Sequence, residues 1–207
     1  LKTQFLYYAS KVNAIEIKDV VFKKEGIDYP LSMGSSGELN LLNIFFGISS
    51  CIEDNSLILI DEPEISLHSD WQMQFIPLIK ETFSNYKGCH YIIATHAPMV
   101  ITNIGESNSS ILNMSTKETV SSKEYNHQSS DYINSYLFGT PGHKNETLNR
   151  EIVSLLSAIS KRKKLDESKL EKAKLIIKWA ESLVDEDPIK TLASILEEAL
   201  KVYENDH

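Results

Sequence analysis

The sequence predicts an α/β fold class, with a parallel sheet core and flanking helices followed by an α-helical C-terminal region. Two short apolar runs, 57–60 and 91–95, end at polar residues, and a helix-like segment separates them. A strand, a helix and a strand at this spacing form a βαβ unit, whose two strands are parallel neighbours. From residue 145 onward, apolar residues recur at three- and four-residue steps, as in amphipathic helices. We therefore expect one part over 1–142 and a helical extension over 143–207.

The first part of the chain contains further predicted elements. Residues 14–22 alternate between apolar and polar and predict a strand with one buried face. A loop over 26–37 leads to a helix over 38–50, whose broad apolar face indicates packing on more than one side. The run 57–60 is expected to be a fully buried strand, because all four residues are apolar. A helix over 70–86 then connects the two parallel strands.

The second half of the chain is predicted to be mainly helical. Residues 110–122 indicate a β-hairpin, and 129–142 read as a polar and aromatic connector. Asp187 is expected to cap a helix that opens at Pro188, because proline suits the first helical turn. The basic run 161–164 lies between helices, where a solvated turn is favoured over an anion- or DNA-binding patch.

Composition excludes some classes of function. The 207 residues are 42% hydrophobic and 24% charged, which is ordinary for a globular protein. The net charge of -8 argues against a cationic nucleic-acid binder, although a local patch or a partner could still contact DNA or RNA. No apolar stretch reaches the roughly 20 residues that span a bilayer, and no secretory signal is visible. We expect a cytoplasmic protein without a membrane partner, and, since the chain starts at Leu1, a piece of something longer.

The run 56–64 is the strongest chemical pattern. It reads Ser-Leu-Ile-Leu-Ile-Asp-Glu-Pro-Glu, an apolar strand that ends at adjacent carboxylates. Asp61 at the strand tip could hold Mg²⁺ through water, because Mg²⁺ prefers oxygen ligands and keeps several waters. Glu62 on the following turn could polarise a water molecule against a γ-phosphate. The alternative is a buried strand followed by an acidic turn.

Four residues at the start of the predicted helix 38–50 form a candidate anion site. Ser35, Ser36, Gly37 and Glu38 combine hydroxyl groups, a glycine that permits close backbone approach, and the unpaired amides of a helix start. The same residues would also form an ordinary serine N-cap with an acidic first turn. The sequence leaves both interpretations open.

His96 is a candidate sensor of the phosphate. It follows the strand 91–95, and the carboxyl ends of parallel strands share one edge of a sheet. Asp61, Glu62, Thr95 and His96 should therefore converge on that edge. A lone histidine is more often structural, but one beside this acidic pair could contact a γ-phosphate.

Together these patterns resemble a known family. Residues 34–38 resemble the ABC signature loop in the form found in SMC-, RecF- and OLD-like ATPases, and 58–63 resemble Walker B. Residues 64–68 resemble a D-loop, and 92–98 resemble the switch-histidine motif. The four motifs occur in the family's order within 30–100. Within the class, the chain resembles the PtuA-like ATPases of Septu and retron anti-phage systems.

The resemblance implies the C-terminal lobe of an ABC-type ATPase head, with ATP and Mg²⁺ bound between two head-to-tail subunits. One subunit would use Asp61 toward Mg²⁺, Glu62 as general base and His96 toward the γ-phosphate. The other would supply Ser35 and Gly37 to the γ-phosphate. The full set of expected cofactor-binding residues is Ser35, Ser36, Gly37, Glu38 and His68.

The chain departs from the family at three places. Gly34 replaces the leucine that opens the signature, which leaves the key hydroxyl open between Ser35 and Ser36. His68 stands where many transporters have the D-loop aspartate. No Gly-x-x-x-x-Gly-Lys-[Ser/Thr] loop occurs in the 207 residues, so the chain alone is not expected to complete an ATP site.

The predicted function is ATP binding and hydrolysis that gates an effector or a DNA-related complex in bacterial anti-phage defence. The alternative is a nucleotide-gated scaffold with little turnover that holds a partner nuclease. Expected partners are a second copy or a higher oligomer, and a nuclease or other effector. The C-terminal helices either cap the ATPase core or dock that effector. Residues 185–187 have the spacing of a nuclease Asp-x-Asp motif, but helix capping explains them better.

Overall fold

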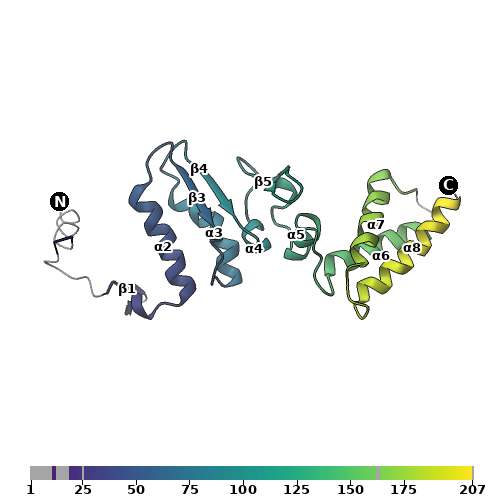
Figure 1. The fold of residues 1–207 in the computed structure, drawn as a ribbon, viewed down its shortest axis with the longest axis horizontal. Helices are drawn as coiled ribbons and strands as arrows, with labels where there is room; N and C mark the ends of the chain where they lie inside the picture. The colour runs from purple at the N-terminus through teal and green to yellow at the C-terminus, as the bar shows by residue number, and fades with distance from the viewer. Residues whose placement is uncertain (1–10, 13–18, 25, 162–163, 207) are drawn as a thin grey trace. The chain divides into compact units, whose positions relative to one another are not determined.

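The computed structural model describes residues 11–12, 19–24, 26–161 and 164–206. The chain forms two compact units, Leu1–Ala97 and Pro98–His207, and each is described by itself (Figure 1). Most of the predicted strand 14–22 lies outside the described residues, as does part of the basic run 161–164. The functional division predicted at residue 142 stays a prediction.

The first unit opens with a short hairpin that leads into helix α2. Strand β1 (Val21–Lys24) pairs antiparallel with β2 (Ile27–Pro30), and a 3₁₀ turn η1 (Leu31–Met33) follows. Helix α2 (Ser36–Cys51) starts where Ser35 forms a capping box with Glu38. The box satisfies two amides that a helix start leaves unpaired, which explains why α2 begins earlier than predicted.

A parallel βαβ unit forms the centre of the first unit, as predicted. Strand β3 (Leu57–Asp61) lies beside β4 (His90–Ala94), with Asp61 in register with Ala94. Helix α3 (Ser69–Thr82) connects them, so it is shorter than the predicted helix 70–86. The mixed α/β class is thereby confirmed.

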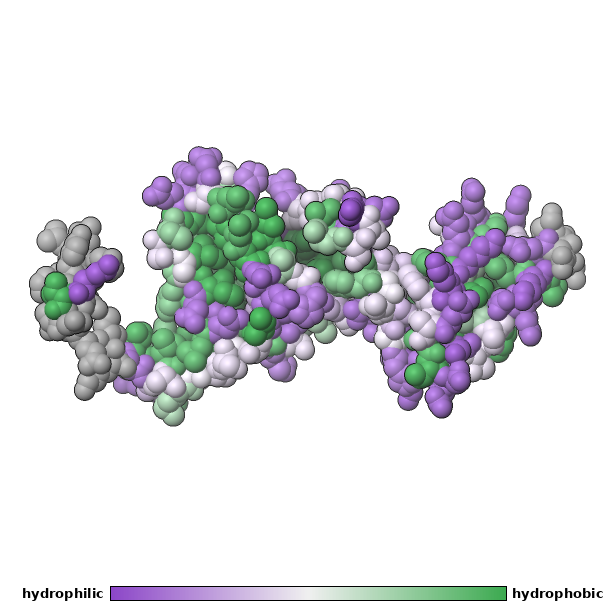
Figure 2. All heavy atoms as spheres, viewed as in Figure 1, coloured by the Kyte–Doolittle hydropathy of each residue, from purple (hydrophilic) through white to green (hydrophobic). Residues whose placement is uncertain are grey.

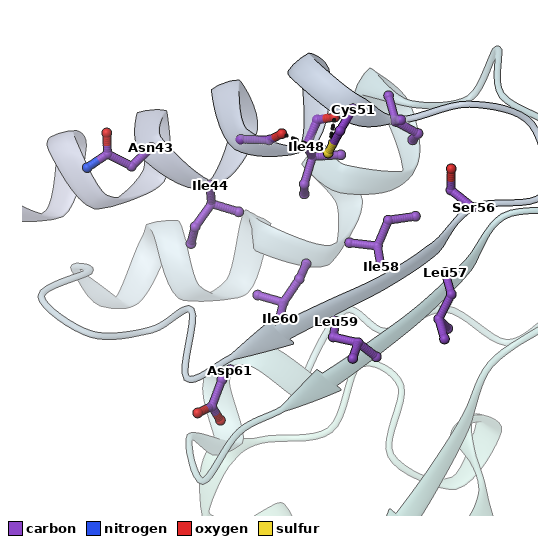
Figure 3. A pocket seen from close by; sticks show the side chains of 12 residues that line it. Asn43, Ile44, Ile48, Cys51, Ser56, Leu57, Ile58, Leu59, Ile60 and Asp61 are labelled. Atoms are coloured by element: carbon purple, nitrogen blue, oxygen red, sulfur yellow. Dashed lines mark hydrogen bonds between the residues drawn. The ribbon is translucent and has the colours of Figure 1, made fainter.

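The two faces of this sheet differ in burial. Ile58 and Ile60 point toward α2, and Ile60 is only 7% exposed (Figure 3). On the other face, Leu57, Leu59 and Ile92 are 63%, 69% and 58% exposed. The prediction of a fully buried strand is therefore wrong, because in the described residues no helix covers this face. Figure 2 shows hydrophobic surface over α2 and the β3–β4 sheet.

The second unit begins with small elements. A short helix α4 (Pro98–Ile101) precedes the hairpin of β5 (Ser110–Asn113) and β6 (Glu118–Ser121), which confirms the predicted hairpin. The next segments are a 3₁₀ turn η2 (Ser122–Glu124) and helix α5 (Ser130–Tyr136).

Helix α5 occupies a segment that was predicted to be a connector. The Ser129 side chain accepts a hydrogen bond from the amide of Tyr132 and so caps the helix. Ile133, in the middle of α5, is fully buried in a cluster with Ile101, Tyr125 and Leu137. Tertiary packing therefore stabilises a helix that is too short to show a sequence period.

Three longer helices complete the second unit, as the apolar periodicity predicted. They are α6 (Glu146–Ser160), α7 (Glu167–Ala180) and α8 (Pro188–Asp206). The predicted cap at Asp187 is confirmed, because its carboxylate accepts a hydrogen bond of 2.9 Å from the amide of Ile189. None of the helices in the described part of the chain is long and apolar enough to cross a membrane.

Candidate functional site

The end of β3 presents two carboxylates at the edge of the sheet. Asp61 is the last residue of the strand and its side chain lies at the strand tip, beyond Ile60 (Figure 3). The amide of Glu62 donates to the carbonyl of Ala94 at 2.8 Å, which extends the ladder by one bond. Glu62 then adopts a left-handed conformation with φ of 43°, and the chain turns sharply. Such a conformation is costly for a residue with a side chain and is often found at functional sites.

His96 lies against Glu62, as the topology predicted. Its Nδ1 is 3.2 Å from Oε1 of Glu62, and the two side chains are 73% and 46% exposed. An exposed pair of this kind contributes little to stability. If Nδ1 donates to the carboxylate, Nε2 is left to accept from or, when protonated, to donate to another molecule. The pair is thus open to a ligand rather than part of the core.

Glu64 is a member of this site that the sequence did not single out. Its side chain is 6% exposed, and its Oε1 accepts hydrogen bonds from the Thr95 hydroxyl at 2.7 Å and the His96 amide at 3.2 Å. Its Oε2 is buried and has no partner among the described residues. The sequence signal was a third carboxylate close behind Asp61, but burial of that carboxylate depends on contacts with the end of β4.

A second group of predicted residues lines a pocket in the same unit. Its volume is about 320 Å³. It combines the start of α2, the loop before α3 and the first turn of α3. The lining residues are Ser35, Gly37, Glu38, Ser66, Leu67, His68 and Trp71.

Gly37 allows the start of α2 to lie directly against the loop before α3. A Cβ atom built on Gly37 would be 2.3 Å from the carbonyl oxygen of Ser66, a distance that real structures do not tolerate. Ser66 itself is left-handed, with φ of 63°. Asn40 strengthens the contact, because its side-chain amide donates to the carbonyl of Ile65 at 3.0 Å. The signature-like and D-loop-like segments therefore form one continuous surface.

Ser35 and His68 each cap a helix at this surface. The Ser35 hydroxyl donates to a carboxylate oxygen of Glu38 at 2.9 Å and accepts from the Glu38 amide at 3.3 Å. The Glu38 carboxylate also accepts from the hydroxyl of Tyr29, whose pKa is raised by burial and by the Glu38 charge. His68 Nδ1 accepts from the amide of Asp70 at 3.5 Å. The N-cap interpretation of Ser35 is thus confirmed, while Ser36 is exposed in the first turn.

One carboxylate at the strand tip, that of Asp61, could help to hold Mg²⁺ if other ligands came from a bound molecule and water. Among the described residues, no group of three or more His, Cys, Asp or Glu side chains could hold a metal by itself. Mg²⁺ commonly binds through one or two carboxylates, waters and substrate phosphates. Asp61 supplies one such carboxylate at the edge of the sheet.

The N-terminal part of the chain is similar to known proteins. Residues 1–101 match the family described as an AAA ATPase domain. This part of the chain is therefore similar to an ATPase domain. All the predicted site residues fall within the matched segment, and the resemblance to the SMC/RecF/OLD-like ATPases is confirmed.

Two curated relatives come from retrons. The chain is 27% identical over 101 residues to the retron Ec83 probable ATPase of Escherichia coli, a match that covers 44% of this chain and 18% of the relative. It is 24% identical over 122 residues to the retron Vc95 probable ATPase of Vibrio cholerae serotype O1 biovar El Tor, covering 51% and 23%. The chain thus spans about a fifth of the length of these relatives.

Proposed function

We propose that this ATPase domain hydrolyses ATP at a site between two head-to-tail subunits, as the C-terminal lobe of an ABC-type head. The observation that carries the proposal is the pair of Glu62 and His96 at the ends of two parallel strands, beside Asp61. Ligands bind at this edge of open α/β sheets. The pair is exposed and therefore accessible to a nucleotide.

The chemistry required is mainly positioning, because phosphoryl transfer demands little covalent participation by the protein. Glu62 orients the attacking water and accepts its proton. His96 contacts the γ-phosphate through the nitrogen that does not face Glu62. Asp61 would hold Mg²⁺ through the water shell of the ion, and the chemistry that the ion would supply is neutralisation of phosphate charge.

The pocket beside α2 supports the head-to-tail arrangement. Its residues differ from the strand-tip residues, so the pocket and the strand tips are separate places in the first unit, as two half-sites of a head-to-tail dimer would require. We propose that Ser35, or Ser36, and Gly37 face the γ-phosphate held by the other subunit, with Glu38 and His68 shaping the same pocket. The N-terminus of a helix as long as α2 favours an anion at that position.

The experiment that tests this function is Glu62→Gln in the full-length protein. The amide keeps the shape of Glu62 but cannot accept a proton, so ATP turnover is expected to fall at least about 100-fold, the scale of general-base catalysis. ATP binding should persist, and the variant should accumulate as an ATP-bound dimer. Phosphate release measures turnover, and light scattering with and without ATP measures the dimer.

The matched control is Glu81→Gln, an exposed carboxylate at the end of α3 and away from the strand tips. It should keep turnover and assembly unchanged. Turnover in Glu62→Gln equal to that of the unmodified protein would contradict the assignment. ATP-dependent assembly without measurable turnover in the unmodified protein would instead support the nucleotide-gated scaffold.

The biological setting is also a proposal. Both relatives are named as probable ATPases of retrons, which supports a retron-type setting for this chain, and we propose that its role there is anti-phage defence. We propose that the nucleotide-dependent dimer gates a partner effector, such as a nuclease, in the cytoplasm.

A further inference from the structure

Glu64 is a buried carboxylate that the proposed chemistry does not use. It follows the strand tip by three residues, and its side chain is 6% exposed. A buried carboxylate is costly unless other groups hydrogen-bond to it. Its partners come from the other strand tip, so Glu64 joins the end of β3 to the end of β4.

The first effect of Glu64 is to fix the backbone after β4. Its Oε1 accepts from the Thr95 hydroxyl at 2.7 Å and from the His96 amide at 3.2 Å. The Thr95 hydroxyl in turn accepts from the amide of Ala97 at 3.0 Å. Thr95, His96 and Ala97 are therefore held by one carboxylate oxygen, directly or through the hydroxyl.

The second effect concerns the ring of His96. Its Nδ1 is 3.2 Å from Oε1 of Glu62 and 3.5 Å from Oε1 of Glu64, so it faces two carboxylates. The His96 side chain is 73% exposed, which means that packing does little to fix the ring. Its orientation depends on these polar contacts, and Glu64 is the more deeply buried and better anchored of the two carboxylates.

We propose that Glu64 is a positioning residue that holds Thr95 and His96 so that the imidazole of His96 faces both Glu62 and the nucleotide. This inference rests on the proposed function, since it assigns a role within the same hydrolytic site. Glu64 acts through His96 and does not touch ATP. An enzyme loses activity when the contacts that position a catalytic group are removed, because a small misplacement of that group lowers the rate of the reaction.

The test is a double-mutant cycle with Glu64→Leu and His96→Ala in the full-length ATPase, because leucine fills a similar volume but cannot accept the hydrogen bonds. Alone, Glu64→Leu is expected to lower kcat by about tenfold while KM for ATP stays within about twofold, because the nucleotide contacts remain. In the His96→Ala background, Glu64→Leu should cause no further loss, because a residue that acts through His96 has nothing left to position. Glu81→Leu, at an exposed position, serves as the control.

A second pair of variants tests the same hydrogen bond from the other strand. Thr95→Val lacks the hydroxyl and should lower kcat as Glu64→Leu does, whereas Thr95→Ser keeps the hydroxyl and should retain most of the activity. The Thr95 variants test the positioning role by themselves if Glu64→Leu does not fold, which circular dichroism would reveal.

Two results would overturn the proposal while leaving the proposed function intact. One is unchanged kcat in both Glu64→Leu and Thr95→Val. The other is an equal loss from Glu64→Leu with and without His96, which would indicate a merely structural role. If instead Glu62→Gln leaves turnover unchanged, the proposed function itself fails and this inference falls with it.

Discussion

At the scale of single residues, the candidate site depends on close backbone contact as well as on charged side chains. Gly37 faces the carbonyl of Ser66, and no side chain fits between them. The glycine was predicted to serve close approach to a phosphate, and the structure shows a different close approach, to the chain's own loop. Both uses are compatible, because the backbone amide of Gly37 is a separate group from its missing side chain.

Two glycines of α2 provide a direct test of that contact. Gly37→Ala would place a methyl group against the backbone at 2.3 Å, so it should lower the free energy of unfolding by about 1–3 kcal/mol. Gly47→Ala meets nothing within 4 Å and should raise the free energy of unfolding by about 0.5–1 kcal/mol, since alanine favours helices. Urea unfolding of the chain measures both. Similar shifts of the same sign would contradict the close contact.

At the scale of elements, helix caps explain where most helices begin. Ser35, Ser129, Asn145 and Asp166 each accept an amide hydrogen bond at a helix start. Asp187 is the most buried example, with no exposed surface, and it also accepts from the Lys144 amide at 2.9 Å and pairs with His143 at 2.8 Å. It therefore joins the segment before α6 to the start of α8.

Because of Asp187, the free energy of unfolding of the second unit should depend on pH in the acidic range. Burial opposes ionisation, but the two backbone amides and His143 outweigh it and hold the pKa of Asp187 below its usual 3.8. A carboxyl whose pKa is lowered by folding stabilises the protein above its unfolded-state pKa. That contribution is lost as pH falls from about 4 through the folded-state pKa.

Replacement of Asp187 tests this dependence. Asp187→Ala should lower the free energy of unfolding by about 1–2 kcal/mol at pH 7, because it removes a buried cap, and the deficit should shrink below about pH 4. Asp185→Ala, two residues earlier, removes an exposed carboxylate and should have little effect. Urea unfolding followed by circular dichroism, at pH 7 and below about pH 4, measures the loss in the free energy of unfolding at each pH. A deficit that is equal at both values would contradict a role for the ionised carboxylate.

Some helices and strands could be predicted from the sequence and others could not. The βαβ unit and helices α6–α8 were predictable because apolar runs and periods extend over many residues. The open face with Leu59 was not, since a run of four apolar residues looks the same whether one face or both are covered. Helix α5 depends on the burial of Ile133, and the role of Glu64 depends on contacts with Thr95, 31 residues away. Neither can be seen in a local pattern.

At the scale of the whole molecule, the candidate chemistry and the hydrophobic core of helices α6–α8 belong to different units. The strand tips and the pocket beside α2 lie within Leu1–Ala97. A continuous core of buried residues lies within the other unit, among α6, α7 and α8. Its members include Leu148, Ile152, Ile176 and Leu196, each of which has no exposed surface. A unit that contains its own hydrophobic core has the main requirement for independent folding.

We therefore expect a fragment of residues 98–207 to fold cooperatively without the first unit. Two adjacent residues of α8 supply the control, because Leu196 is fully buried and Ile195 is 47% exposed. In the fragment, Leu196→Ala should lower the free energy of unfolding by about 2–5 kcal/mol, since it leaves a cavity in the core. Ile195→Ala should change it by no more than about 0.5 kcal/mol. Thermal and urea unfolding followed by circular dichroism measure these values. A broad transition in the fragment, or equal effects of the two substitutions, would show that the helices depend on the first unit for their packing.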